Sequence, residues 1–197
     1  MRTATCLGGI GILLLAVSLS AENLIWNSGF ELGCGNWEGN TIMEGVTQPR
    51  ELCTSMEITD RYAARGKYAL HIPPQPGRLD TLISSHSFTV KENSDYNFSF
   101  DAMTDQPGMS VSVTVTSVQR KLVRDEAGNI LPPAKQLRAA PELKIVARKF
   151  LRLSEYWTRY SISFRTDAVT KSCTIRFHFP KQKEGGSAWL DNIQVAP

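Results

Sequence analysis

The sequence has little of what marks most enzymes and nucleic-acid-binding proteins. It contains three histidines, and 22 basic against 19 acidic residues leave a formal net charge of +3. So small a charge does not indicate nucleic-acid binding, which requires concentrated positive charge. It has neither a Gly-x-Ser-x-Gly elbow nor a His-Glu-x-x-His motif, so two common hydrolase sites are missing. The acidic residues of the N-terminal third show no pattern that would hold a pair for glycoside hydrolysis. We therefore expect a protein that is not an enzyme.

Cysteine is also scarce. Cys6 lies in the N-terminal leader described below, which leaves Cys34, Cys53 and Cys173. None has the CxxC spacing of a zinc site, and one of the three must stay free or pair with another molecule. We expect a disulfide between Cys34 and Cys53, since both precede strands and an exported chain meets oxidising conditions. Cys173 alternates with apolar residues of a strand, which predicts a buried free thiol.

Long hydrophobic runs are limited to one. The run Leu7–Leu19 follows a basic residue and ends in small residues just before Ala21. This pattern is typical of a signal peptide and predicts the removal of residues 1–20. The run is shorter than the roughly 20 residues that span a bilayer, and no other segment is as apolar. We expect a secreted, periplasmic or extracellular protein without a transmembrane segment, in which residues 21–197 form one domain.

Helical periodicity is nearly absent, and the dominant period is two. Four segments alternate apolar with polar residues, which predicts strands with one buried and one exposed face. They are Tyr96–Phe100, Val111–Thr116, Tyr160–Phe164 and Cys173–Phe179. Shorter strands are expected at Tyr68–Ile72, Leu82–Val90 and Ala188–Val195. Many short strands without intervening helices predict an all-β fold, a two-sheet antiparallel β-sandwich or jelly roll.

A long basic segment interrupts this alternation. Residues 120–143 contain Ala127-Gly128-Asn129, Pro132-Pro133 and Pro141, which predicts a long loop inserted into the domain. The positive charges continue to Arg152. Two interpretations stay open: a solvated loop followed by an edge strand that Lys and Arg protect, or a contact for an acidic glycan.

Several short motifs follow one another in a distinctive order. They are Asn23-Leu24-Ile25-Trp26-Asn27-Ser28-Gly29-Phe30-Glu31, Gly35-Asn36-Trp37, Gly66-Lys67-Tyr68-Ala69-Leu70, Tyr96-Asn97-Phe98-Ser99-Phe100, Trp157-Thr158-Arg159-Tyr160 and Trp189-Leu190-Asp191-Asn192-Ile193-Gln194-Val195. In this order the chain resembles the CenC-type carbohydrate-binding modules, which have the galactose-binding-like jelly roll. The resemblance covers Asn23 to Val195 and implies that the first and last strands lie near each other.

The resemblance also implies a structural calcium ion. In such modules its ligands are the Glu after the Asn-x-Gly-Phe motif, the Asp of the final motif and backbone carbonyls near the Gly-Lys-Tyr motif. The corresponding residues here are Glu31, Asp191, and Gly66 or Lys67. Calcium prefers such hard oxygen ligands. Many relatives have a further acidic residue where this chain has Ala63-Ala64-Arg65, and Asp60 or Glu57 would have to substitute. In the alternative interpretation, Glu31 and Asp191 only form hydrogen bonds at strand ends.

Aromatic residues are the first candidates for contact with a sugar, because their rings stack on the apolar faces of pyranoses. The four tryptophans are Trp26, Trp37, Trp157 and Trp189. For each of them packing in the core is the favoured interpretation, since tryptophan is mostly buried in folded proteins. Tyr62 is the aromatic residue that we expect to be exposed.

The polar faces of the four main strands are the second candidate. If these strands share one sheet, their polar sides form a single surface. That surface would carry Asp101, Arg159, Arg176 and His178 among small hydroxyls. Such groups bind sugar hydroxyls, and two arginines can hold a uronate or a sulfate. We expect this surface to bind the glycan, with Arg176 and His178 as its most important members. An ordinary solvated sheet face is the alternative.

These observations predict a secreted, non-catalytic and monomeric module that binds a polysaccharide or glycan. An accessory role beside a glycoside hydrolase is one option. Because a fold does not fix a function, two alternatives stay open. One is a cell-surface module that binds proteins on the same fold, and the other is a fragment of a glycoside hydrolase.

Overall fold

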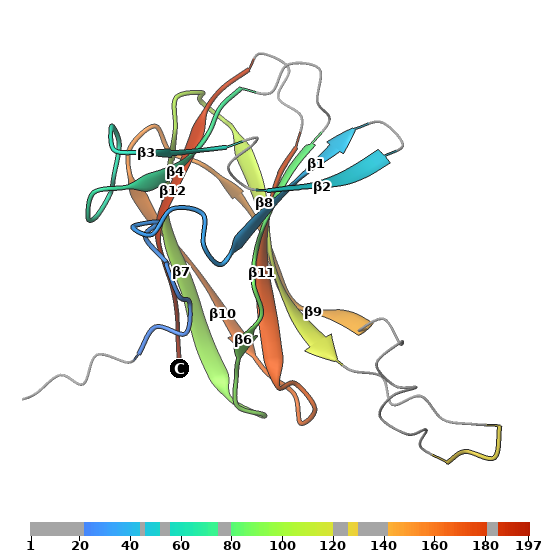
Figure 1. Ribbon diagram of the computed structural model, residues 1–197. Helices are drawn as coiled ribbons and strands as arrows, with labels where there is room; N and C mark the ends of the chain where they lie inside the picture. Colours follow the sequence, from blue (N-terminus) through green and yellow to red (C-terminus); the bar gives the residue numbers. More distant parts are fainter. Residues whose placement is uncertain are drawn as a thin grey trace, which may run out of the picture.

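Alternating apolar and polar residues form extended strands along the chain, and these strands build two layers (Figure 1). The computed structural model describes residues 22–43, 46–51, 56–74, 80–119, 126–129, 142–180 and 185–197. Within these ranges there are twelve strands and no α-helix. None of the described segments is therefore a helix that could cross a membrane. The prediction of an all-β sandwich is confirmed.

The two layers are sheets of unequal size, and every strand pair in them is antiparallel. The larger sheet has the order β2 (Val46–Glu51), β1 (Trp37–Met43), β5 (Asp80–Ser85), β11 (Ser172–Pro180), β8 (Ser110–Gln119) and β9 (Glu142–Arg152), with β6 (Phe88–Thr89) paired to β11. The smaller sheet has the order β10 (Thr158–Arg165), β7 (Asp95–Thr104), β12 (Ala188–Ala196), β4 (Ala69–Ile72) and β3 (Glu57–Thr59).

Aromatic side chains from both sheets meet in the core. The rings of Phe98 and Phe100 on β7 lie 6.0 and 5.0 Å from the ring of Phe177 on β11, and all three side chains are fully buried. Each such burial stabilises the fold by about 1.5–3 kcal/mol. Because successive side chains of a strand point to opposite faces, the polar residues between these aromatics point outwards. The sandwich therefore has two polar outer faces.

Each segment that the alternation predicted contains a strand, and Leu82–Val90 is divided between β5 and β6. The strands β1, β2 and β3 lie in the N-terminal third, for which the alternation predicted no strand. Their sequences lack a clear alternation, and β2 contains Pro49, which is tolerated at a sheet edge. The predicted loop 120–143 lies mostly outside the described residues. Its last two residues begin β9, which is an edge strand, as one of the two interpretations required.

The N-terminal segment is fastened to the last strand. Leu24 donates its backbone N–H to Val195 O at 3.0 Å, and the Asn23 side chain bonds both Ile193 O and Val195 N. The expectation that the two ends lie together is therefore confirmed, although residues 22–36 form turns and not a strand. Strand β12 has a bulge at this point, between Asp191 and Gln194.

The cysteines agree with the sequence as far as the structure describes them. Cys173 is buried and free, as predicted, and burial raises the pKa of its thiol to about 12. Cys34 is disulfide-bonded. Its predicted partner, Cys53, lies outside the described residues, as does the predicted signal peptide 1–20. The pairing of Cys34 with Cys53 stays a prediction.

Candidate functional site

The four residues predicted to share one surface lie on opposite faces of the sandwich. Asp101 and Arg159 belong to β7 and β10 in the smaller sheet, whereas Arg176 and His178 belong to β11 in the larger sheet. The prediction of one continuous polar surface is therefore wrong. Its physical reason is that each sheet turns its apolar side to the common core, so the polar sides point away from each other.

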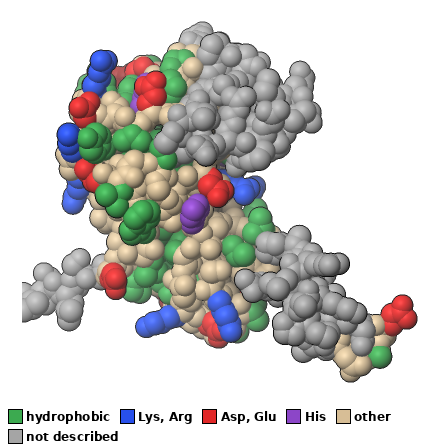
Figure 2. All heavy atoms as spheres, in the orientation of Figure 1, with side chains coloured by type: hydrophobic (Ala, Val, Ile, Leu, Met, Phe, Trp, Pro, Cys, Tyr) green, Lys and Arg blue, Asp and Glu red, His purple; other side chains and the backbone are tan. Residues whose placement is uncertain are grey.

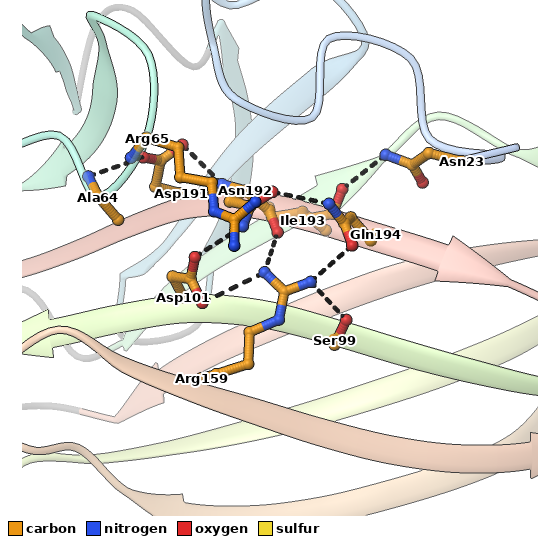
Figure 3. Close-up of polar contacts among 10 residues, drawn as sticks. All are labelled: Asn23, Ala64, Arg65, Ser99, Asp101, Arg159, Asp191, Asn192, Ile193 and Gln194. Carbon is orange, nitrogen blue, oxygen red and sulfur yellow. Dashed lines mark hydrogen bonds and ion pairs between the residues drawn. The ribbon is translucent and has the colours of Figure 1, made fainter. Parts of the chain in front are cut away.

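Arg159 is held on the smaller sheet by four hydrogen bonds (Figure 3). Nη1 donates to Asp101 Oδ1 at 3.2 Å and to Asn192 O at 2.9 Å, and Nη2 donates to Ser99 Oγ at 2.8 Å and to Gln194 Oε1 at 2.7 Å. The Asn192 side chain closes the network by donating to Asp101 Oδ2 at 2.7 Å. The guanidinium therefore ties β10, β7 and the bulge of β12 together. Both Asp101 and Arg159 serve the fold and are poorly placed to bind a ligand.

Arg176 lies in a polar row that crosses the larger sheet. It is paired with Thr114 on β8, which is paired with Arg148 on β9, and on the other side it faces Ser84 on β5. Directly paired residues of antiparallel strands point to the same face. Arg176 Nε lies 3.4 Å from Ser84 Oγ, and neither guanidinium has an ion pair among the described residues. The row therefore offers two arginines with capacity to bind an anion.

His178 lies in the next row of the same face. It is paired with Ser112 on β8, and Ser112 is paired with Phe150 on β9. Phe150 is 75% exposed, whereas the next residue along β9, Leu151, is partly buried against the core. His178 Nε2 lies 2.9 Å from Asp80 Oδ2 without the alignment of a hydrogen bond. An exposed aromatic ring thus shares one row of the sheet with a hydroxyl and an imidazole.

We name the surface formed by these two rows the glycan face, after the prediction that Arg176 and His178 bind a glycan. It consists of Ser112, Thr114, Arg148, Phe150, Arg176 and His178. The sequence predicted Arg176 and His178 as candidates, and it placed Arg148 only in a basic stretch. Phe150 was missed, because its position opposite Ser112 depends on the register of β9. The alternation of Phe150 with its neighbour Leu151 was the available signal.

Asp191 reaches from β12 into the loop that precedes β4. Oδ2 accepts the backbone N–H groups of Ala64 and Arg65, both at 2.8 Å, and Oδ1 accepts that of Asn192 at 2.6 Å (Figure 3). The residue is fully buried. Burial and, to a lesser degree, the nearby charge of Asp101 raise the pKa of Asp191 to about 6, against the opposing effect of the three N–H groups. A buried carboxylate with a raised pKa is a group that a cation would stabilise.

Glu31 binds the same loop from the N-terminal segment. Its Oε1 accepts the backbone N–H of Lys67 at 2.8 Å and that of Tyr68 at 3.1 Å, and these two bonds lower the pKa of Glu31. Gly66 has a φ of +68°, and a side chain there would collide with Glu31 Oε1. The hydrogen-bonding alternative to the calcium hypothesis is thus present in the structure for both carboxylates.

The donor set near Gly29 tests whether calcium also fits. A Cβ on Gly29 would lie 3.5 Å from Asp191 Oδ1 and 3.9 Å from Glu31 Cγ, so the two carboxyl side chains converge there. The described residues contain no group of three or more His, Cys, Asp or Glu side chains that could hold a metal. The carboxylates of Asp191 and Glu31 are hard oxygen donors of the kind that calcium prefers. Calcium would need backbone carbonyl oxygens in addition to them.

The tryptophans divide between the core and the surface. Trp37 is buried in the core, as predicted. Trp189 is buried too, but it lies on the outer side of the smaller sheet. The His71 ring stacks on its indole with 4.9 Å between the ring centroids, and the Tyr62 ring packs edge-on with a centroid distance of 5.2 Å. Tyr62 is exposed, as predicted. The core interpretation is wrong for Trp26, which is 59% exposed in the N-terminal segment.

Comparison with known proteins places the fold among carbohydrate-binding modules. No family model and no curated protein sequence matches the chain. Among solved structures, a family 61 carbohydrate-binding module in complex with β-1,4-galactotriose is similar over 89% of this chain and 98% of that one, with 12% identity and a TM-score of 0.56.

Two further structures are similar in the same way. A family 16 carbohydrate-binding module matches with 15% identity over 89% of this chain and 100% of that one, with a TM-score of 0.56. A family 4 module matches with 15% identity over 88% and 99%, with a TM-score of 0.57. At these identities the likeness shows the fold. The chain is a two-sheet jelly roll with the architecture of these carbohydrate-binding modules.

Proposed function

We propose that this chain is a non-catalytic module that binds a glycan on the glycan face of the larger sheet. The observation that carries the proposal is the exposed ring of Phe150 next to the paired row that holds Arg148, Thr114 and Arg176. An aromatic ring stacks on the apolar side of a pyranose, and hydroxyl groups bind its edge. The fold shared with modules that bind sugars supports the same reading.

The charge on this face indicates an acidic glycan. Arg148 and Arg176 are two strands apart, which separates their backbones by about 10 Å. Arginine side chains extend far enough to meet an anion between them, and a guanidinium binds carboxylate or sulfate with two parallel hydrogen bonds. The ligand class that we propose is a polysaccharide with uronate or sulfate groups.

A structural calcium ion is part of the proposal. Asp191 and Glu31 would supply carboxylate oxygens, and the backbone near Gly66 and Lys67 would supply carbonyls. The ion would offset the negative charge of the buried Asp191 and join the two ends of the domain to the loop before β4. The chain would be exported with the aid of residues 1–20 and act as a monomer outside the cell, where an accessory role beside a glycoside hydrolase fits a binding module.

Affinity electrophoresis and calorimetry test the proposed function. The probes are polygalacturonate and heparin as acidic glycans, with xylan and β-1,4-galactan as neutral ones. We expect binding to at least one acidic glycan that weakens as salt screens the arginines. Incubation with the bound glycan should release no reducing ends.

Substitutions locate the binding surface. Arg176→Ala and Phe150→Ala should each weaken binding about tenfold while the melting temperature stays near that of the wild type. Arg165→Ala is the matched control, because Arg165 is an exposed arginine on the smaller sheet, paired with Asp95 at 2.7 Å. Undiminished binding by both face variants would overturn the assignment of this surface.

A further inference from the structure

An exposed tryptophan lies at a pocket away from the glycan face. The pocket has a volume of about 320 Å³ and lies between the N-terminal segment and β6. Its lining includes Glu22, Trp26, Asn36, Ser87 and Thr89. Figure 2 shows hydrophobic side chains at the surface where the N-terminal segment crosses the sandwich, next to a histidine and charged side chains.

The indole of Trp26 is fixed on one side by the backbone. A Cβ on Gly35 would lie 2.9 Å from Trp26 Cζ3 and 3.1 Å from Cη2, so the ring rests directly on Gly35. Asn36 Nδ2 donates to Trp26 O at 3.0 Å and so holds the backbone of Trp26 in place. Because the side chain is still 59% exposed, its other side is open to solvent.

Hydrogen bonds hold the loop that carries the indole in its conformation. Asn27 adopts a φ of 52°, and its Nδ2 donates to Gly33 O at 2.9 Å and to Gly35 O at 2.8 Å. Trp37 Nε1 donates to Asn27 O at 3.2 Å, which anchors the loop to the core. A flat ring held in place in this way loses little conformational entropy when a ligand covers it.

We propose that Trp26 is the stacking platform of a separate subsite for a neutral sugar ring. Ser87 and Thr89 supply hydroxyls to the pocket, and Glu22 supplies a carboxylate. None of these three side chains has a hydrogen bond to a described residue, so all are available to sugar hydroxyls. The described lining contains no basic side chain that could pair with an acidic sugar, so a neutral pyranose is the fitting ligand.

The position of the pocket relates it to the glycan face. Thr89 on β6 is paired with Ser172, four residues before Arg176 on β11. At about 3.4 Å per residue, some 14 Å separate the two places along the strand. The inference rests on the proposed function only in assigning a saccharide, since different side chains form the two sites.

Nuclear magnetic resonance of the tryptophan indole groups tests this subsite on the wild-type protein. The probes are hexasaccharides of β-1,4-linked glucose, xylose and galactose, and Trp26→Phe assigns the Trp26 signal. We expect at least one hexasaccharide to shift the Trp26 indole resonance more than those of the buried Trp37 and Trp189. An unmoved Trp26 signal with all three hexasaccharides would overturn the proposal.

Variants then measure the contribution of the ring. Trp26→Ala and Gly35→Ala should each weaken binding of the active hexasaccharide about tenfold, the second by displacing the ring. Tyr156→Ala is the matched control, because Tyr156 is 77% exposed and lies outside the pocket. Unchanged affinity in Trp26→Ala would contradict the subsite.

The variant Arg176→Ala separates the two proposals. It should lose acidic glycans and keep the shift of the Trp26 resonance. If only the proposal of the glycan face is wrong, the hexasaccharide still shifts the Trp26 resonance. If only the proposal of the Trp26 subsite is wrong, the wild type still binds acidic glycans.

Discussion

Arg159 on β10 and Gln194 on β12 are joined by a 2.7 Å hydrogen bond that passes over the intervening strand β7. The same guanidinium binds Asp101 and Ser99 on β7 itself. One side chain therefore links three neighbouring strands at the point where the bulge interrupts the pairing of β12 with β7. The bulge leaves backbone groups without ladder partners, and Arg159 satisfies one of them, the carbonyl of Asn192.

Removal of this link should lower stability. Hydrogen bonds to charged groups contribute about 1.5–3 kcal/mol, so Arg159→Ala should reduce the free energy of unfolding by about 2 kcal/mol. Urea denaturation of the purified domain measures the change. Arg165→Ala on the same strand is the control and should cost less than about 0.5 kcal/mol, because its ion pair is exposed. Equal stability of wild type and Arg159→Ala would show that the network is dispensable.

Calcium should stabilise the folded domain if the proposed site forms. A ligand that binds only the folded state raises stability by mass action. We expect a chelator to lower the melting temperature of the wild type at fixed ionic strength, and calcium to restore it. Asp191→Ala should melt at one temperature regardless of the chelator. If neither the chelator nor calcium changes the melting temperature of the wild type, the calcium site is ruled out.

Acid should weaken the contact between β9 and the turn before β11. Asp167 accepts Thr170 Oγ1 at 2.6 Å, Lys144 Nζ at 3.0 Å and Val169 N at 3.1 Å, and these bonds hold its pKa well below the usual 3.8. Since the folded pKa is depressed, the stabilisation is present above about pH 4 and is lost as the pH falls below that value. Urea midpoints between about pH 5 and pH 2 should fall less steeply for Asp167→Asn than for the wild type. Parallel curves would contradict this role of Asp167.

Cys173 should be chemically silent in the folded protein. Burial raises the pKa of its thiol to about 12, so the reactive thiolate is rare at neutral pH. A chromogenic disulfide reagent should find no reactive thiol in the folded chain of residues 21–197. After unfolding without reductant it should find one, because we expect Cys34 and Cys53 to be bonded to each other. Three thiols in the unfolded protein would contradict the disulfide.

The strands and the core were predictable because they depend on local alternation. Phe98 and Phe100 alternate with polar residues, and this pattern alone places them inside. The same pattern cannot tell which strands share a sheet. It therefore grouped Arg159 with Arg176, although the chain places β10 and β11 in different layers.

The candidate sites required information that the sequence does not carry locally. Phe150 joins the row of His178 and Ser112 only through the register of β9 against β8, which a bulge between Val115 and Thr116 shifts. Trp26 stands in a motif that resembles a buried strand, yet its ring lies on the backbone of Gly35, nine residues further along the chain. Such contacts depend on the final path of the loop and not on residue preferences.

The reason for a glycine at position 35 has an evolutionary consequence. The φ of Gly35 lies outside the left-handed region, so the backbone itself does not demand glycine there. The demand comes from the indole of Trp26, which occupies the space of a side chain. Glycine should therefore be retained at position 35 only where position 26 is tryptophan. Where another residue replaces Trp26 in a homologue, alanine or serine fits at position 35, so positions 26 and 35 should change together.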